Sequence, residues 1–109
     1  METILPFSKE LDNLSDKTID FWGAEAQTNM VIEEASELIK AICKWKRYGG
    51  LELENAIVDE MADMYITLNT LKRILNVSDR TLDLKVFDKG MRTYERLDKE
   101  EEILEDPHY

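Results

Sequence analysis

A glycine pair, Gly49-Gly50, separates two long stretches in which apolar residues recur every three or four positions. This spacing draws one apolar stripe along an α-helix. The stripe positions are Val31, Ala35, Leu38, Ile42 and Trp45 before the pair, and Ile57, Met61, Met64, Leu68, Leu71 and Leu75 after it. The pattern predicts two amphipathic helices, from about residue 24 to 48 and from about 53 to 75, and an antiparallel helical hairpin if the chain reverses at the glycines.

Each of the two predicted helices carries a pair of carboxylates three residues apart, Glu34 with Glu37 and then Glu60 with Asp63. Residues three apart lie on neighbouring turns of one helix face. The midpoint between Glu34 and Asp63, and that between Glu37 and Glu60, both fall on the glycine break. A hairpin would therefore bring four carboxylates together, an arrangement that is unfavourable unless a cation such as Mg²⁺ or Mn²⁺ binds between them.

Shorter elements are expected on both sides of the hairpin. Pro6 interrupts residues 1–14, which are expected to form an irregular lead-in, and Ser15 is a candidate N-cap for a helix ending at Trp22. Ser78 is a good N-cap for a last helix that runs to about residue 97, before an acidic tail over 98–109. No strand-like alternation competes with this pattern. The predicted fold class is all-α, a four-helix bundle or a helical hairpin completed by two flanking helices.

Composition excludes several classes of function. The formal net charge of −10 argues against general nucleic-acid binding, which needs a basic face, and against docking on an anionic membrane. With Cys43 the only cysteine and His108 the only histidine, cysteine zinc sites and Ser-His or Cys-His nucleophiles are ruled out. No N-terminal signal segment or membrane-spanning run is visible, so the expected setting is a reduced cytoplasm.

The two acidic motifs, read together, resemble the signature of the MazG-like all-α nucleoside triphosphate pyrophosphohydrolases. The relatives of this superfamily include dimeric dUTPases and phosphoribosyl-ATP pyrophosphatases. The matching residues are Glu33, Glu34 and Glu37 in the first motif and Glu60 and Asp63 in the second. Weaker matches are Trp22-Gly23 and Gln27 upstream, and Lys89-Gly90-Met91-Arg92 downstream, so the resemblance spans roughly residues 18 to 96.

The resemblance implies a MazG-like catalytic domain over residues 15–97 that binds Mg²⁺ through Glu34, Glu37, Glu60 and Asp63. The implied reaction is hydrolysis of a nucleoside triphosphate, deoxy or non-standard, to a nucleoside monophosphate and pyrophosphate in a house-cleaning role. Either Glu37 or Glu33 would accept the proton of the attacking water, and the choice between them stays open. The resemblance also implies a homodimer or homotetramer.

Four further residues are candidate substrate contacts. The guanidinium or ammonium groups of Lys89 and Arg92 would neutralise phosphates, although pairing with neighbouring acids is an equal alternative. Trp22 would stack on a base or pack in an interface, and Gln27 would hydrogen-bond the edge of a base because a buried amide needs a partner.

A second interpretation is a non-catalytic helical protein–protein interaction module. In a chain that is 35% charged, acidic residues three apart also arise by chance as solvated helix faces. A di-iron carboxylate bundle is disfavoured because such sites normally need Glu-x-x-His motifs.

Overall fold

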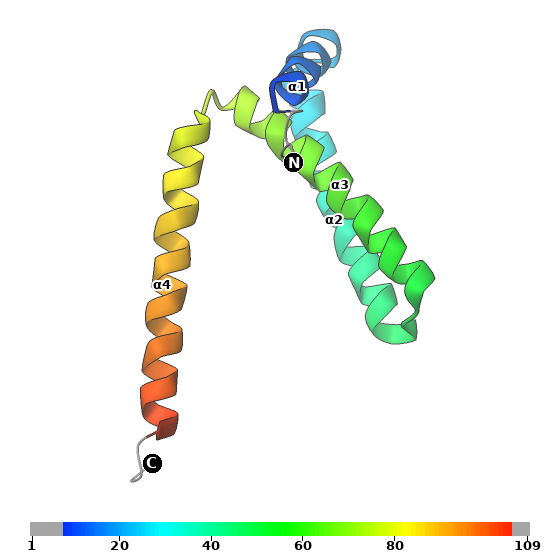
Figure 1. Ribbon diagram of the computed structural model, residues 1–109. Helices are drawn as coiled ribbons and strands as arrows, with labels where there is room; N and C mark the ends of the chain where they lie inside the picture. Colours follow the sequence, from blue (N-terminus) through cyan, green and yellow to red (C-terminus); the bar gives the residue numbers. More distant parts are fainter. Residues whose placement is uncertain (1–7, 106–109) are drawn as a thin grey trace, which may run out of the picture. The chain divides into compact units, whose positions relative to one another are not determined.

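The computed structural model describes residues 8–105, and over this range the chain is helical apart from short connections (Figure 1). The four helices are α1 (Ser8–Trp22), α2 (Ala24–Tyr48), α3 (Leu51–Ile74) and α4 (Asp79–Glu105). No strand occurs among the described residues, so the predicted all-α class is confirmed. None of the helices in this range is both long enough and apolar enough to cross a lipid bilayer.

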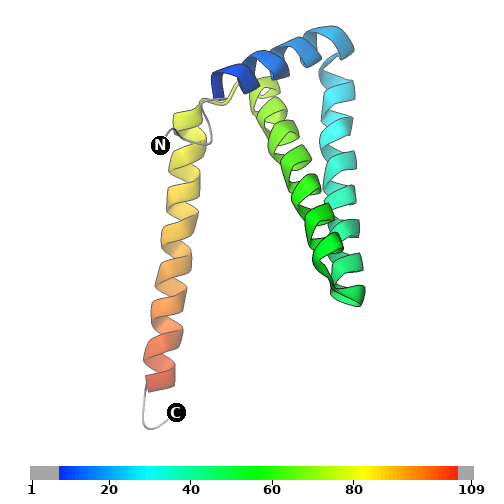
Figure 2. The same ribbon diagram turned by 45° about the vertical axis from the view of Figure 1, so that its right-hand side comes forward.

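The hairpin predicted from the glycine pair is present. α2 and α3 lie side by side and run in opposite directions, as both views show (Figures 1 and 2). Gly49 and Gly50 connect the two helices. Gly49 has φ 66° and ψ −172°, and Gly50 has φ 102° and ψ 152°, a backbone region that residues other than glycine rarely adopt. The Gly49 N–H also donates to the Trp45 carbonyl at 2.7 Å and so closes the last turn of α2.

The first helix begins earlier than expected. α1 starts at Ser8, so the N-cap role predicted for Ser15 is wrong, and residues 8–14 of the expected lead-in are helical. The remaining lead-in residues, 1–7, lie outside the described range. Ser15 is only 1% exposed in the middle of α1, where it faces the 4%-exposed Thr70 of α3. Ser15 is therefore a buried contact between α1 and α3 and not the start of a helix.

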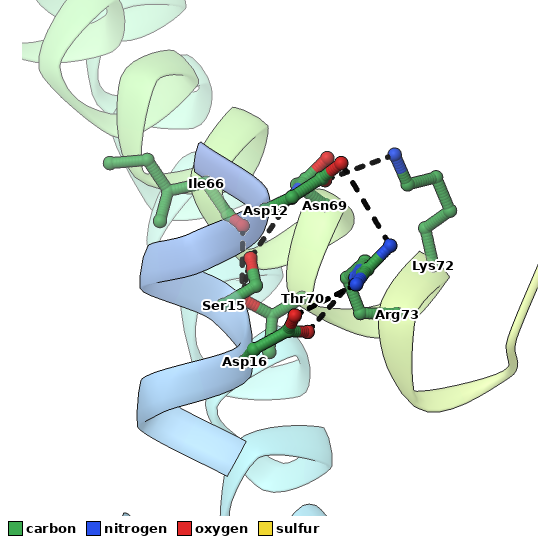
Figure 3. A network of polar contacts seen from close by, with 8 residues as sticks. All are labelled: Asp12, Ser15, Asp16, Ile66, Asn69, Thr70, Lys72 and Arg73. Atoms are coloured by element: carbon green, nitrogen blue, oxygen red, sulfur yellow. Dashed lines mark hydrogen bonds and ion pairs between the residues drawn. The ribbon is translucent and has the colours of Figure 1, made fainter. Parts of the chain in front are cut away.

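α1 is attached to α3 by a polar network centred on Ser15 (Figure 3). The Asn69 side-chain amide donates to Asp12 Oδ1 at 3.0 Å and to Ser15 Oγ at 2.9 Å. The Thr70 hydroxyl donates to the same Ser15 oxygen at 3.1 Å. Because these polar groups satisfy one another, their burial between the two helices carries little penalty.

Ion pairs from Lys72 and Arg73 of α3 to Asp12 and Asp16 of α1 extend the network toward solvent (Figure 3). Arg73 donates through Nε and Nη2 to the two carboxylate oxygens of Asp16, at 2.9 and 2.7 Å, and Lys72 Nζ lies 3.4 Å from Asp12 Oδ1. The hydrogen bond from Asn69, with help from Lys72 and Arg73, lowers the pKa of Asp12 despite partial burial. The bond from Arg73 likewise lowers the pKa of Asp16.

The chain divides after Asn76 into two compact units, the first containing α1, α2 and α3 and the second containing α4. Asn76 adopts a positive φ of 54° just beyond α3, as expected for a residue that ends a helix. Ser78 caps α4 as predicted, because its hydroxyl accepts the Thr81 backbone N–H at 3.1 Å. α4 continues to Glu105, so residues 98–105 of the acidic tail extend the helix.

The described part of the first unit contains no fully buried apolar side chain. Its buried residues are the polar pair Ser15 and Thr70. The apolar stripes of α2 and α3 meet along the hairpin, but residues such as Val31, Leu38 and Ile57 remain half-buried there. Two helices side by side cannot enclose a side chain from all directions, and α1 covers only one end of the pair.

Candidate metal centre

Three carboxylates from the hairpin converge on one point. Glu34 of α2 and Glu60 and Asp63 of α3 each offer one oxygen, and these oxygens all lie within 4.8 Å of one another. The chain reversal at Gly49-Gly50 sets the register that places Glu34 beside Asp63. Two oxygens bound to one Mg²⁺ or Mn²⁺ at about 2.0–2.2 Å lie no more than about 4.4 Å apart, so a small shift of these side chains would let their oxygens share one ion.

The burial of the cluster fits a bound cation. Glu34 and Glu60 are half-buried, whereas Asp63 is exposed, so the cluster has one open side. The Glu60 Oε2 atom is fully buried and has no hydrogen-bond partner. A buried carboxylate oxygen without a donor is costly, and a cation between the three acids would remove that cost.

The surroundings of Glu34 disfavour its charged form. Partial burial raises the pKa of Glu34 above its ordinary value, and repulsion from Asp63, Glu60, Glu33 and Glu37 raises it further. Both causes disfavour the charged carboxylate, and a bound divalent cation would reverse them.

The other two predicted acids lie beside the cluster rather than in it. Glu37 is exposed, one turn after Glu34, and is not among the three residues whose oxygens converge. Glu33 is also exposed, and its backbone carbonyl accepts the Ser36 hydroxyl at 2.6 Å. Both carboxylates are near enough to raise the Glu34 pKa, so each could accept a proton close to the cluster. Their roles as ligand or base stay predictions.

A cleft of about 500 Å³ begins at the acidic cluster and extends toward α1. Its long walls are matched positions of the hairpin: Glu34 and Asp63 at one end, then Met30 and Thr67, then Gln27 and Thr70. Each of these pairs is symmetric about the same glycine break. Trp22 and Thr18 of α1 contribute to the wall at the far end. The lining is mostly apolar with a few polar groups, which is typical of small-molecule sites.

The two predicted base-contacting residues are both placed in this cleft. Gln27 is half-buried in the first turn of α2, and its neighbours on the wall are largely apolar. Trp22 is 61% exposed at the end of α1 and makes an edge-on contact with Phe21, with ring centroids 5.3 Å apart. The indole is therefore available to an aromatic ligand from the solvent side.

The two predicted phosphate contacts belong to the second unit. Lys89 and Arg92 are exposed on α4, and neither makes an ion pair with any residue of the described range. The Lys89 carbonyl accepts the Thr93 hydroxyl within the helix. Their part in the site stays a prediction.

Sequence reasoning missed the threonines of the cleft, Thr18, Thr67 and Thr70. A usable signal was present for two of them, because Thr67 and Thr70 follow Asp63 by four and seven residues and so continue its helix face. Thr18 carried no such signal, since its place depends on how α1 docks. Comparison with known proteins adds nothing to this assignment, since no family model, curated protein or solved structure matches the chain.

Proposed function

We propose that this protein is a Mg²⁺-dependent nucleoside triphosphate pyrophosphohydrolase of the MazG-like kind. Mn²⁺ is a plausible substitute because the proposed ligands are all carboxylates. The observation that carries the proposal is the cluster of Glu34, Glu60 and Asp63 around the unpartnered Glu60 oxygen. The proposed substrate is a deoxynucleoside or non-standard nucleoside triphosphate, and the products are a nucleoside monophosphate and pyrophosphate.

The chain's own residues supply the remaining parts of the reaction. A bound Mg²⁺ would hold the phosphates and favour attack of water on phosphorus. Glu37 or Glu33 takes the proton of that water, the new oxygen–phosphorus bond forms, and the bridge between the α- and β-phosphates breaks. Neither carboxylate is engaged by an ion pair with another described residue. No covalent protein nucleophile is required.

The cleft beside the cluster accommodates the nucleoside in this proposal. Trp22 stacks on the base, and the Gln27 amide donates to and accepts from its edge. The resemblance assigns phosphate contacts to Lys89 and Arg92 of α4, and these contacts are kept as part of the proposal. The cytoplasmic setting and the homodimer or homotetramer implied by the resemblance are part of the same proposal.

The first test measures metal binding and activity together in the full chain. Millimolar Mg²⁺ should raise the thermal midpoint by mass action, and pyrophosphate release should appear with at least one nucleotide of a panel of common and damaged triphosphates. Glu34→Ala and Asp63→Ala should abolish both effects, and Asp59→Ala serves as the matched control. Asp59 is an exposed acid of α3 outside the cluster, so its substitution should change neither effect.

Two results would contradict the proposal. One is a thermal midpoint that is indifferent to Mg²⁺ in the unaltered chain. The other is a complete lack of pyrophosphate release across the panel with Mg²⁺ or Mn²⁺ present. Stabilisation by Mg²⁺ without hydrolysis would leave the metal site standing and remove the enzymatic part.

A non-catalytic interaction module is the second candidate, and the exposed apolar side chains of the hairpin favour it. In that case the acids serve only as a solvated surface. Mg²⁺ would then leave the thermal midpoint unchanged, both in the unaltered chain and in variants that lack Glu34 or Asp63. Removing either acid would raise stability by relieving repulsion around Glu34.

A further inference from the structure

The three threonine hydroxyls of the cleft all donate to acceptors inside the protein. The Thr18 hydroxyl donates to the Ser15 carbonyl at 2.8 Å, and the Thr67 hydroxyl donates to the Asp63 carbonyl at 3.1 Å. The Thr70 hydroxyl donates to Ser15 Oγ at 3.1 Å (Figure 3). Because a hydroxyl has one hydrogen and two lone pairs, these three side chains can turn only lone pairs or methyl groups toward a ligand.

Turning one of these hydroxyls to donate to a ligand would bring little net gain. The hydroxyl would lose a hydrogen bond inside the protein and would form another of about the same strength. Accepting a hydrogen bond from a ligand requires no such exchange, because the lone pairs are the free part of the group. The threonines of the cleft therefore favour ligand groups that donate over ligand groups that accept.

Gln27 is the other uncharged polar side chain of the cleft that can meet the edge of a base. It is half-buried and makes no hydrogen bond to another residue of the range 8–105. Its amide carries both donors and an acceptor, and half a turn lets it pair with a base edge of either polarity. An indole stacked on the base keeps its N–H parallel to the plane of the base, so Trp22 cannot reach that edge. Selection between base edges is therefore left to the threonines.

We propose that Thr18 makes the cleft selective for bases with an exocyclic amino group, such as cytosine and adenine, over bases with a carbonyl at that position, such as uracil and hypoxanthine. The selectivity rests on the proposed function, whose substrate class it narrows. Gln27 pairs with one amino hydrogen and the adjacent ring nitrogen, and the second amino hydrogen donates to Thr18 Oγ1. A carbonyl base would instead turn a lone pair toward an oxygen that has no hydrogen to offer, and would lose its bond to water without replacement.

Thr18 is the threonine best placed for this contact. Thr18 and Trp22 are four residues apart on α1, so they lie on one helix face and are neighbours in the cleft wall. A base that stacks on Trp22 can present its edge to Thr18. Thr70 is only 4% exposed and is less accessible to a ligand, whereas Thr67 lies one turn from the acidic cluster and so is nearer the phosphates.

The test compares pairs of triphosphates that differ only in this edge of the base. With Mg²⁺, the full chain should hydrolyse dCTP with a kcat/KM roughly tenfold above that for dUTP, and dATP with a kcat/KM above that for dITP by a similar factor. Equal or higher kcat/KM for the carbonyl member, in each pair that the chain hydrolyses, would overturn the selectivity and leave the proposed function intact.

Thr18→Val keeps the shape of the side chain and removes its oxygen, so the two ratios should fall several-fold toward one. Thr28→Val is the matched control, because the Thr28 hydroxyl donates to the Ala24 carbonyl at the same 2.8 Å but does not line the cleft. It should leave both ratios unchanged. A merely structural effect of valine would lower both members of a pair alike, so ratios that stay unchanged in Thr18→Val would overturn the role of Thr18.

Binding of nucleosides separates this selectivity from the proposed function. Deoxycytidine and deoxyuridine carry no phosphate and need no metal, and the NMR signal of the Trp22 indole N–H reports their binding at the cleft. Several-fold tighter binding of deoxycytidine, lost in Thr18→Val, would support the role of Thr18 even if no triphosphate were hydrolysed. Equal affinities, or no shift of the Trp22 signal with either nucleoside, would overturn it.

Discussion

At the scale of single residues, the charged form of Glu34 is unfavourable in the absence of a cation. It is half-buried and surrounded by the carboxylates of Asp63, Glu60, Glu33 and Glu37, and both effects raise its pKa. Nearby, Glu60 holds a buried oxygen without a hydrogen-bond donor. In a purely structural site, a neighbouring basic side chain would offset this repulsion. The uncompensated acids therefore favour a site that binds a cation.

The raised pKa of Glu34 predicts how stability depends on pH in the absence of metal. The folded state holds the Glu34 proton to higher pH than the unfolded chain, whose ordinary value is 4.5. The free energy of unfolding should therefore fall as pH rises from 4.5 through the raised pKa, and stay lower above it. Thermal midpoints measured across this range should show the decline, and Glu34→Gln should flatten it.

Mg²⁺ should change this pH profile. Protons and cation compete for the same carboxylate, so stabilisation by Mg²⁺ should be greatest above the raised pKa of Glu34 and weaken as pH falls through it. Asp12 and Asp16 act in the opposite sense at lower pH, since their lowered pKa values make stability fall as they are protonated below 3.8. An acid-side decline that persists in Glu34→Gln belongs to them, whereas an unchanged Mg²⁺ response in that variant would contradict the role of Glu34.

At the scale of helices, the site depends on two junctions. The glycine turn sets the register of α2 against α3, and the Ser15 network attaches α1, which supplies Trp22 to the cleft. The first junction is a property of backbone conformation, and the second is a property of matched polar side chains. Each can be tested by a substitution that leaves every cluster residue in place.

Gly50→Ala should destabilise the hairpin by about 1–3 kcal/mol, because a φ of 102° with a ψ of 152° is nearly closed to residues with a Cβ atom. No atom lies within 4 Å of the added Cβ, so the cost would come from the backbone alone. Urea unfolding monitored by circular dichroism measures the change. Gly90→Ala inside α4 is the control, and it should be neutral or stabilising by up to about 1 kcal/mol.

Ser15→Ala should cost about 0.5–1.5 kcal/mol, since it removes the acceptor that Asn69 and Thr70 share. The two donors keep their bonds to Asp12 and to the Ile66 carbonyl, so neither is left unsatisfied. The same substitution should raise the KM for a nucleotide substrate by loosening α1 at the cleft wall. Thr93→Ala, on an exposed face of α4, should stay within about 0.5 kcal/mol of the unaltered chain. Equal effects of the two substitutions in urea unfolding would contradict a structural role for the Ser15 network.

At the scale of the whole molecule, the described chain consists of two units that carry different parts of the proposed machinery. The hairpin unit holds the acidic cluster and the cleft, and the second unit holds Lys89 and Arg92. An acidic metal site needs positive charge to accept a triphosphate, and the cations of α4 are the proposed source. Metal binding is proposed to require only the first unit.

Lys89→Ala and Arg92→Ala should therefore raise KM by roughly tenfold or more, a loss of about 1.4 kcal/mol or more of binding each, while Mg²⁺ still raises the thermal midpoint. Glu60→Gln should abolish both the hydrolysis and the rise of the thermal midpoint with Mg²⁺. Arg80→Ala, at the start of α4, is a control for the loss of one positive charge and should leave both unchanged. Steady-state kinetics beside thermal midpoints separates these outcomes, and unaltered kinetics in both α4 variants would confine the site to the first unit.

The sequence by itself determined the local features of this protein. The three-and-four spacing of apolar residues predicted α2 and α3 to within two residues, and Ser78 marked the start of α4. The glycine pair predicted the reversal, because its backbone angles are closed to most residues. These features follow from forces between residues close in sequence, which a linear pattern records.

Only the tertiary structure decided which of the paired acids converge. Glu37 follows Glu34 by three residues, whereas Glu60 precedes Asp63 by three. Because the two helices are right-handed and antiparallel, these two steps rotate the side chains in opposite senses relative to the contact between α2 and α3. Glu60 therefore turns toward α2 and is partly buried, whereas Glu37 turns away and is exposed. The burial of Ser15 likewise depends on Asn69 and Thr70, more than fifty residues away, and no local pattern contains that information.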